Sequence, residues 1–203
     1  MAAEFIHKFV PGRLPVAVLL LHGSGGDEND LLPVARAIAP GAAFLSPRGK
    51  VTDRGLLRFY AFDKSDLKER TAELAEWIAE AAGKYQIDAA RLYALGYSNG
   101  ANVAGVLMLL HPGTIAGACL LRARTAIEHA EPEVLPALGG APVLISAGQH
   151  DELIPPEGAQ ELAELLTRAG ARVDLAMQNA GHDLTPADFS LAKQWFARVM
   201  AGS

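Results

Sequence analysis

Short apolar runs alternate with longer amphipathic segments along this chain. Six apolar runs have the length of buried strands, at residues 16–22, 42–46, 91–96, 115–121, 141–147 and 172–178. Apolar residues recur at helical spacing in residues 30–39, 66–83, 99–110, 157–169 and 187–200. This alternation predicts an α/β fold in which a mostly parallel central sheet carries helices on both faces.

The same pattern indicates one domain over residues 1–203. A chain of 203 residues is long enough for one well-buried core, and it contains no internal repeat or linker. Residues 4–10 could add an edge strand to the sheet. Residues 51–65 show no clean period and hold three aromatic side chains, so we predict a loop that takes part in binding. No segment is long enough for a large lid domain.

Composition narrows the class of protein. Half of the residues are hydrophobic and 20% are charged, as in ordinary globular proteins, and the net charge of -5 argues against nucleic-acid binding. The first ten residues lack the apolar stretch of a signal peptide, and no run of 18 apolar residues could span a membrane. We therefore expect a cytoplasmic protein with no nucleic-acid or membrane partner. The single cysteine, Cys119, is predicted to be a buried core thiol.

The motif G-Y-S-N-G at residues 96–100 stands between a predicted strand and a predicted helix. It fits the G-x-S-x-G pattern of a nucleophilic serine on a tight strand-to-helix turn. A Cβ two residues before or after that serine would clash, which explains the two glycines. The helix would also direct its N-terminal N–H groups and the positive end of its dipole at the site. Ser98 is therefore the predicted nucleophile.

A serine hydroxyl becomes a good nucleophile when a base removes its proton, and the usual base is histidine. Among six histidines, His182 lies in a loop of small and polar residues after the last predicted strand and is the predicted base. His150 ranks below it because its side chain should project elsewhere. His22 precedes a glycine-rich loop and is interpreted as a structural residue that fixes this loop. His7, His111 and His129 are interpreted as surface or packing residues.

The base needs a carboxylate to hold its tautomer. Asp151 follows the predicted strand at 141–147 and is the first candidate, with Glu152 and Asp183 as alternatives. The chain order Ser98, Asp151, His182 is the order used in the fold to which this motif belongs. Each of these residues is commonplace in its own loop, so the argument depends on their occurring together at the ends of strands.

Two backbone N–H groups should stabilise the oxyanion of a tetrahedral intermediate. Asn99, directly after the serine, would supply one, and Ser24 in H-G-S-G-G at residues 22–26 would supply the other. The glycine-rich loop lacks the lysine of a P-loop and fits no G-x-G-x-x-G register, so we expect no dinucleotide cofactor.

Several segments carry a resemblance to a known family. They are L-H-G-S-G-G-D-E-N-D-L-L from Leu21, S-P-R-G-K from Ser46, R-F-Y from Arg58, L-G-Y-S-N-G-A-N from Leu95, A-G-Q-H-D from Ala147 and G-H-D-L from Gly181. Together they resemble the small bacterial phospholipase/carboxylesterase family of α/β-hydrolases, which is related to the acyl-protein thioesterases. The resemblance extends from Val16 to Trp195. It implies a single-domain α/β-hydrolase, esterase activity without cofactor or metal, and often a homodimer.

Residue by residue, the resemblance implies a catalytic triad of Ser98, Asp151 and His182, with Ser24 and Asn99 in the oxyanion hole. Asp27 and Glu28 match an acidic pair of the family and are interpreted as loop-shaping groups, with Asp27 as a cap for the next helix. Arg48 and Arg58 also match. Each could order the aromatic loop or contact an acidic group of a substrate, and the first interpretation is favoured.

Two segments depart from the family pattern. Relatives tend to carry a short apolar, proline-containing stretch where this chain has R-A-R-T-A-I-E-H-A-E at residues 122–131, and the segment 51–65 is shorter than in many relatives. Both segments would border the acyl pocket, so the substrate range cannot be taken from the family. The predicted pocket residues are Phe59, Tyr60, Phe62, Leu153 and Arg58, although the apolar ones could equally be core.

These expectations combine into a carboxylesterase for small, short-chain esters that works through an acyl-enzyme on Ser98. The same machinery would cleave thioesters, and a catalytically silent binding protein on the same fold is an alternative from another class. If His182 is the base, activity should rise through about pH 6–7.5.

Overall fold

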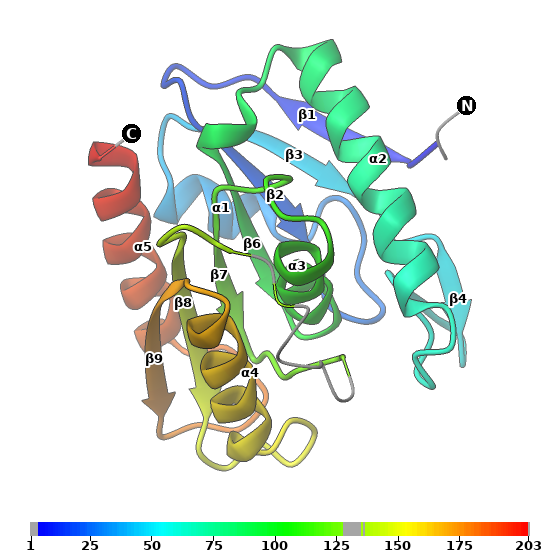
Figure 1. Ribbon diagram of the computed structural model, residues 1–203, viewed down its shortest axis with the longest axis vertical. Helices are drawn as coiled ribbons and strands as arrows, with labels where there is room; N and C mark the ends of the chain where they lie inside the picture. The colour runs from blue at the N-terminus through cyan, green and yellow to red at the C-terminus, as the bar shows by residue number, and fades with distance from the viewer. Residues whose placement is uncertain (1–3, 128–134, 136, 203) are drawn as a thin grey trace.

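The computed structural model describes residues 4–127, 135 and 137–202, and its centre is a twisted seven-stranded sheet (Figure 1). Across the sheet the strands are β1 (His7–Val10), β3 (Ala43–Pro47), β2 (Ala17–Leu21), β6 (Leu92–Tyr97), β7 (Gly117–Leu121), β8 (Pro142–Gly148) and β9 (Arg172–Gln178). Strand β1 is antiparallel to β3, and every other neighbouring pair is parallel. The predicted mostly parallel sheet is confirmed, and residues 4–10 do contain its edge strand.

Helices cover both faces of the sheet (Figure 1). They are α1 (Leu32–Ile38), α2 (Leu67–Tyr85), α3 (Asn99–Leu110), α4 (Pro156–Arg168) and α5 (Pro186–Ala201), with a short 3-10 helix at Ala89–Arg91. Helices α2, α3 and α4 share one core cluster, and α1 and α5 share the other. Successive residues of β2 serve the two sides, because Leu19 packs into the first cluster and Leu20 into the second. The fold class predicted from the sequence is confirmed.

Helix α3 packs at the middle of the sheet and is buried along almost its whole length. Every residue from Asn99 to Leu109 is buried, so this helix is hydrophobic on all sides rather than amphipathic. Burial on all sides holds the helix in one position. The turn that precedes it therefore stands on a rigid support.

The segment predicted as a loop at residues 51–65 begins with a β-hairpin. Strands β4 (Val51–Asp53) and β5 (Leu56–Arg58) pair antiparallel, and Arg54 and Gly55 connect them with φ angles of 51° and 76°. Two consecutive residues with positive φ form the tight connection that matches strand twist in two-residue hairpins. The prediction of an irregular loop is therefore wrong for residues 51–58.

Cys119 lies in β7 and is completely buried, as predicted. Burial raises the pKa of its thiol, which disfavours the reactive thiolate. In residues 4–127, 135 and 137–202 the structure contains no helix with the length and apolar character needed to cross a membrane.

Candidate active site

Ser98 lies at the junction between β6 and α3 in a strained backbone conformation. Its φ and ψ angles are 50° and -114°, a region that residues other than glycine rarely occupy. Its N–H donates a hydrogen bond of 2.9 Å to the carbonyl of Leu121 at the end of β7. The sharp turn raises the serine above the carboxyl edge of the sheet, as the motif predicts.

The two glycines of the motif are required by close backbone contacts. A Cβ on Gly96 would lie 2.6 Å from Cα of Ala101, and a Cβ on Gly100 would lie 2.0 Å from the carbonyl oxygen of Leu21. The steric clash that the sequence predicted for a Cβ at either glycine is therefore confirmed. Gly100 is constrained chiefly by the end of β2, a neighbour that the motif alone does not identify.

His182 connects the serine to a buried carboxylate. Its Nε2 accepts a hydrogen bond of 3.0 Å from the hydroxyl of Ser98, and its Nδ1 lies 2.8 Å from Oδ2 of Asp151. The three side chains come from the loops after β6, β8 and β9, so the parallel strands bring them to one edge of the sheet. The hydroxyl of Tyr97 holds the histidine loop through a 3.2 Å bond to the carbonyl of His182.

Asp151 is held in place by the turn that follows it. The residue is 4% exposed, and its Oδ1 accepts the N–H groups of Leu153 and Ile154 at 2.9 Å each. A carboxylate fixed in this way accepts the Nδ1 proton of the imidazole. Nε2 then carries a lone pair toward Ser98, which is the tautomer that a general base needs.

The lower-ranked candidates lie elsewhere. His150 is exposed, and its Nε2 is 2.9 Å from Oδ1 of Asn179. Glu152 and Asp183 are exposed, and neither carboxylate contacts His182 in the described part of the chain. His7 bonds the hydroxyl of Tyr85 at 2.8 Å, whereas His129 is outside the described residues.

His22 ties the glycine-rich loop to the end of β3. The N–H of Gly49 donates to its Nε2 at 2.9 Å, so the Nδ1–H donates to the carbonyl of Gly23 at 2.7 Å. Burial lowers the pKa of His22, which keeps the ring in the neutral form that this pair of bonds requires. The interpretation of His22 as a structural residue agrees with these contacts.

The acidic pair of the glycine-rich loop has structural contacts. Glu28 accepts two hydrogen bonds from Arg48, at 2.5 and 2.9 Å, and these bonds lower the pKa of its carboxyl. Arg48 therefore orders this loop rather than the aromatic one. Asp27 accepts the backbone and side-chain N–H groups of Asn29 at 2.7 and 2.9 Å. The prediction that Asp27 caps the next helix is wrong, because α1 has no side-chain cap.

The two predicted oxyanion donors remain available. Among the described residues, neither the backbone N–H of Ser24 nor that of Asn99 donates a hydrogen bond. The Asn99 side chain has a different task, because its Oδ1 accepts the N–H of Phe59 at 2.7 Å. This bond fixes the aromatic segment next to the serine.

A cavity of about 390 Å³ opens beside Ser98. It is lined by Ser24, Leu56, Arg58, Tyr60, Phe62, Tyr97, Ser98, Asn99, Asn102, Arg124, Leu153, Ile154 and His182. Four of the five predicted pocket residues are among them. Phe59 is the exception, because it points into the core. The residue is 4% exposed, and the centre of its ring lies 4.8 Å from the centre of the His22 ring.

Sequence reasoning did not single out Asn102 or Arg124. Asn102 lies one helical turn after Ser98, and apart from Asn99 at the first position every other residue of α3 is apolar or glycine, so this polar residue was a usable signal. Arg124 was not named individually, but it belongs to the segment 122–131, which was predicted to border the pocket, and its place in the cavity lining agrees with that prediction.

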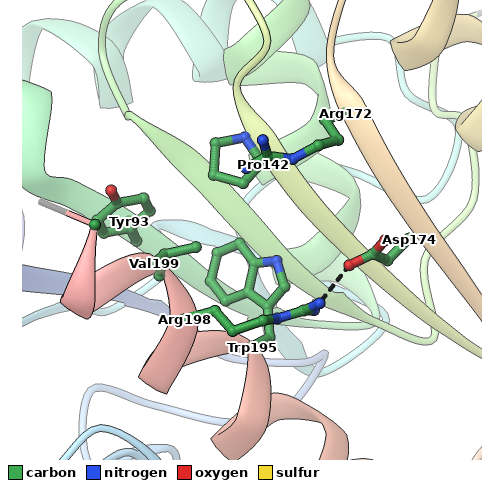
Figure 2. A pocket seen from close by; sticks show the side chains of 8 residues that line it. Tyr93, Pro142, Arg172, Asp174, Trp195, Arg198 and Val199 are labelled. Carbon is green, nitrogen blue, oxygen red and sulfur yellow. Dashed lines mark hydrogen bonds and ion pairs between the residues drawn. The ribbon is translucent and has the colours of Figure 1, made fainter.

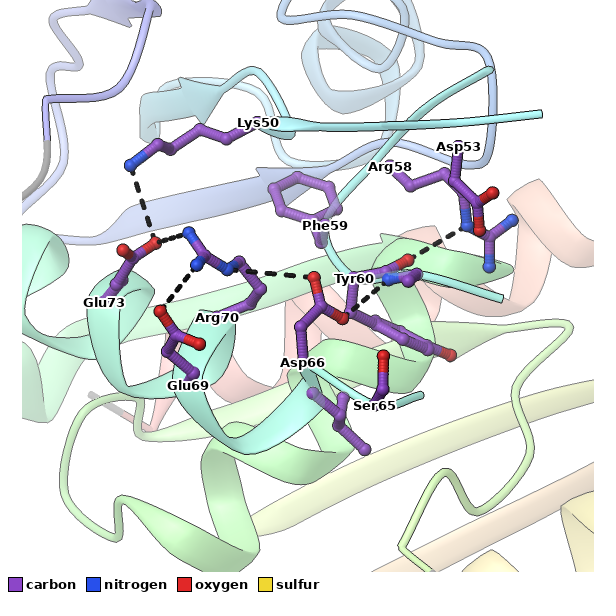
Figure 3. A network of polar contacts seen from close by, with 12 residues as sticks. Lys50, Asp53, Arg58, Phe59, Tyr60, Ser65, Asp66, Glu69, Arg70 and Glu73 are labelled. Carbon is purple, nitrogen blue, oxygen red and sulfur yellow. Dashed lines mark hydrogen bonds and ion pairs between the residues drawn. The ribbon is translucent and has the colours of Figure 1, made fainter. Parts of the chain in front are cut away.

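A network of charges holds the aromatic segment at the start of α2 (Figure 3). Asp66 accepts the N–H of Ala61 at 2.8 Å and lies 3.7 Å from Arg70. Arg70 in turn pairs with Glu69 and Glu73 at 2.6 Å each. The cavity wall formed by this segment is therefore anchored to a long helix.

A second serine–aspartate pair is buried nearby. The hydroxyl of Ser146 donates to Asp188 at 2.6 Å, and Asp188 also pairs with Arg122. Burial alone would raise the pKa of Asp188, but hydrogen bonds from Arg122, Ser146 and Thr185 outweigh it and lower the pKa. Ser146 has no exposed surface, so a substrate cannot reach it. The pair is structural.

Another cavity, of about 440 Å³, lies at the opposite edge of the sheet (Figure 2). Pro142 and Arg172, the first residues of β8 and β9, line it together with Trp195 of α5. Among the residues that the structure describes, its lining contains no serine, cysteine or histidine. The candidate nucleophile and base therefore lie at the carboxyl edge of the sheet and not in this second cavity. Within the described ranges there is also no group of three or more His, Cys, Asp or Glu residues that could hold a metal ion.

Comparison with known proteins gives matches along nearly the whole chain. The family described as Phospholipase/Carboxylesterase matches residues 13–199. MhqD of Bacillus subtilis (strain 168), described as a hydrolase, is 39% identical over 200 residues, which are 96% of this chain and 98% of that protein. The Bacillus cereus carboxylesterase superimposes with a TM-score of 0.91 and 37% identity, over 97% of this chain and 95% of its own. A carboxylesterase from Mesorhizobium loti does so with a TM-score of 0.87 and 35% identity, over 95% and 94% of the two chains.

Proposed function

Because the chain belongs to the phospholipase/carboxylesterase family of α/β-hydrolases, we propose that it is a serine esterase that cleaves small carboxylic esters through an acyl-enzyme on Ser98. The observation that carries the proposal is the continuous contact from Ser98 through His182 to Asp151, at 3.0 and 2.8 Å. A hydroxyl, an imidazole and a buried carboxylate in this arrangement form the relay that activates a nucleophile.

The geometry supports a two-step reaction. His182 Nε2 takes the proton of Ser98 as the oxygen attacks the ester carbonyl, and the N–H groups of Ser24 and Asn99 stabilise the oxyanion. His182 then gives the proton to the departing alcohol. Water enters, loses a proton to the same nitrogen and hydrolyses the acyl-enzyme, which regenerates the serine.

The size of the cavity favours small substrates. A volume of about 390 Å³ lies near the lower end of the usual range for small-molecule pockets, roughly 300–1,000 Å³. We therefore propose short acyl chains as the preferred ones. A thioester would react by the same steps, so a thioesterase is the second candidate, and the third is a binding protein without catalysis.

Hydrolysis of 4-nitrophenyl esters from acetate upward in chain length tests this proposal, together with the Ser98→Ala variant. Turnover that is highest for short chains and absent in Ser98→Ala is the expected result. Ser146→Ala is the matched control, because Ser146 also bonds an aspartate but lies away from the cavity. If wild type and Ser98→Ala are equally inactive on esters and thioesters while both stay folded, the binding-protein alternative replaces the esterase.

We also propose that the protein forms a homodimer and resides in the cytoplasm. These two proposals rest on the family resemblance and on the acidic composition, respectively. Light scattering on the purified protein measures its mass in solution, and fractionation of producing cells shows where the protein resides.

A further inference from the structure

The cavity beside Ser98 has an unusual charge for this protein. Among the described residues, its lining includes two arginines, Arg58 and Arg124, and no aspartate or glutamate, although the whole chain has a net charge of -5. A cleft with charges of one sign attracts ligands of the opposite sign. The described lining of the cavity is therefore positively charged, whereas the chain as a whole is negatively charged.

Among the described residues, Arg58 is buried without a carboxylate in ion-pair contact, although Asp53 is close enough to act on its charge. It is 6% exposed, its Nε donates to the carbonyl of Tyr60 at 3.0 Å, and its Nη1 bonds the hydroxyl of Ser24. Its guanidinium also lies 3.6 Å from the centre of the Phe62 ring. In the described part of the chain no acidic side chain lies within ion-pair distance of it. Buried charges are normally paired, so this arginine has unused capacity for an anion.

Arg124 reaches the same cavity from the other side. Its N–H donates to Oδ1 of Asn102 at 2.9 Å, and Nδ2 of Asn102 donates to the hydroxyl of Tyr60 at 3.0 Å. Asn102 therefore fixes the backbone of Arg124 to the same helix that carries the serine. The stem of Arg124 is also packed tightly against α4, because a Cβ on Gly158 would lie 2.9 Å from Cβ of Arg124.

The described acidic side chains near Arg124 form no ion pair with it. Glu157 and Glu161 line an adjoining hollow together with Arg124 and Lys64. Neither glutamate forms an ion pair with Arg124 in residues 4–127, 135 and 137–202. The guanidinium of Arg124 therefore lacks a carboxylate in ion-pair contact among these residues, as does that of Arg58.

Apolar side chains complete the cavity. Leu56, Phe62 and Leu153 belong to its lining and are 39%, 38% and 70% exposed. A ligand that fits all of these groups has a short apolar part and one anionic end. A carboxylate is well suited to this site, because guanidinium groups bind it through paired, charge-assisted hydrogen bonds.

We propose that Arg58 and Arg124 form an anion-binding subsite beside Ser98, and that the preferred substrates are small esters that carry a carboxylate. This inference rests on the proposed esterase function and narrows its substrate class. Arg58 also bonds Ser24, so the test changes Arg124 instead.

The experiment compares matched esters with and without a carboxylate. Mono-4-nitrophenyl glutarate and 4-nitrophenyl pentanoate form a pair that differs in the acyl part, and 4-acetoxybenzoate and 4-acetoxybenzamide form a pair that differs in the alcohol part. In at least one pair, kcat/KM of wild type should favour the charged ester about tenfold, and Arg124→Gln should remove this preference. Arg124→Lys should keep part of it. Arg36→Gln removes an exposed arginine from α1 on the other face, and it should leave the ratio unchanged.

Two outcomes would overturn the proposal separately from the esterase. A charged-to-neutral ratio of one or less in both pairs, unchanged in Arg124→Gln, removes the subsite while Ser98-dependent turnover of neutral esters remains. If no ester is cleaved, the proposed function fails and the subsite is judged by glutarate binding to Ser98→Ala in titration calorimetry. Binding that is lost on adding Arg124→Gln supports the subsite, and the absence of binding overturns it.

Discussion

Arg122 donates to both carboxylate oxygens of Asp188, at 2.8 and 2.9 Å, and neither side chain is exposed to solvent. The same guanidinium donates to the carbonyls of Gly181 and Asp183 at 2.8 and 2.9 Å. These carbonyls flank His182 in the chain. A buried ion pair between the end of β7 and the start of α5 therefore holds the loop that carries the candidate base.

Replacing Arg122 tests this relationship. Arg122→Met should lower the free energy of unfolding by about 3–5 kcal/mol, because it leaves the carboxylate of Asp188 buried without its partner. Arg198→Met breaks the exposed Arg198–Asp174 pair and should change stability little. Urea denaturation of both variants measures the difference. Equal losses would show that burial of the Arg122 pair is unimportant.

Mutation of Asp151 should remove activity without unfolding the protein. In Asp151→Asn the amide cannot hold the Nδ1–H tautomer of His182, so kcat should fall by roughly 10³–10⁴-fold. Asp183→Asn is the control, since that side chain is exposed and next in sequence to the histidine. Steady-state kinetics on a 4-nitrophenyl ester would compare the two. Comparable activity in both variants would exclude Asp151 from the relay.

Protonation of His22 should destabilise the fold in mild acid. Burial lowers the pKa of His22 in the folded state, so the neutral ring is favoured there more than in the unfolded chain. Its contribution to stability is therefore present above about pH 6.5 and is lost as the pH falls below that value.

The control for His22 is His22→Gln, which can still accept the N–H of Gly49 but does not titrate in this range. Between about pH 7 and pH 5, the free energy of unfolding should decrease more in wild type than in this variant. Identical slopes of stability against pH in the two proteins would contradict the assignment. Denaturation, rather than activity, is the correct measurement because it reports the stability of the fold directly.

The contact between Gly100 and β2 predicts a large effect for a single methyl group. Gly100→Ala would place Cβ 2.0 Å from the carbonyl oxygen of Leu21, and the resulting shift should cost about 1–3 kcal/mol or more and move Ser98. Gly83→Ala in α2 meets no atom within 4 Å and should stabilise the protein by about 0.5–1 kcal/mol. Thermal unfolding of the two alanine variants should therefore shift in opposite directions.

Much of the architecture could be predicted because its signals are local. The apolar runs that form β2 and β7 are buried at every position, so hydrophobicity alone marks them. The serine turn was equally visible, because steric exclusion at Gly96 and Gly100 leaves a short motif. The hairpin at residues 51–58 was missed because Arg54 takes a positive φ angle that sequence patterns rarely associate with arginine.

The surroundings of the site depend on contacts that local sequence does not specify. Nothing near Arg122 indicates that its carboxylate partner lies 66 positions away. The direction of Phe59 was also unpredictable. Phe59 points into the core, whereas the neighbouring Tyr60 also borders the cavity. Neither residue belongs to a strand whose alternation would fix the direction of its side chain.

The wide separation of the relay along the chain has a consequence for synthesis. Ser98 and His182 are 84 positions apart, and the loop of His182 needs both β9 and the first turn of α5 for its support. A nascent chain that has completed β6 and α3 already contains Ser98, the proposed nucleophile, but it lacks the proposed base. The proposed hydrolytic competence should therefore arise only after α5 has left the ribosome, and a shorter growing chain would carry Ser98 in an inert form.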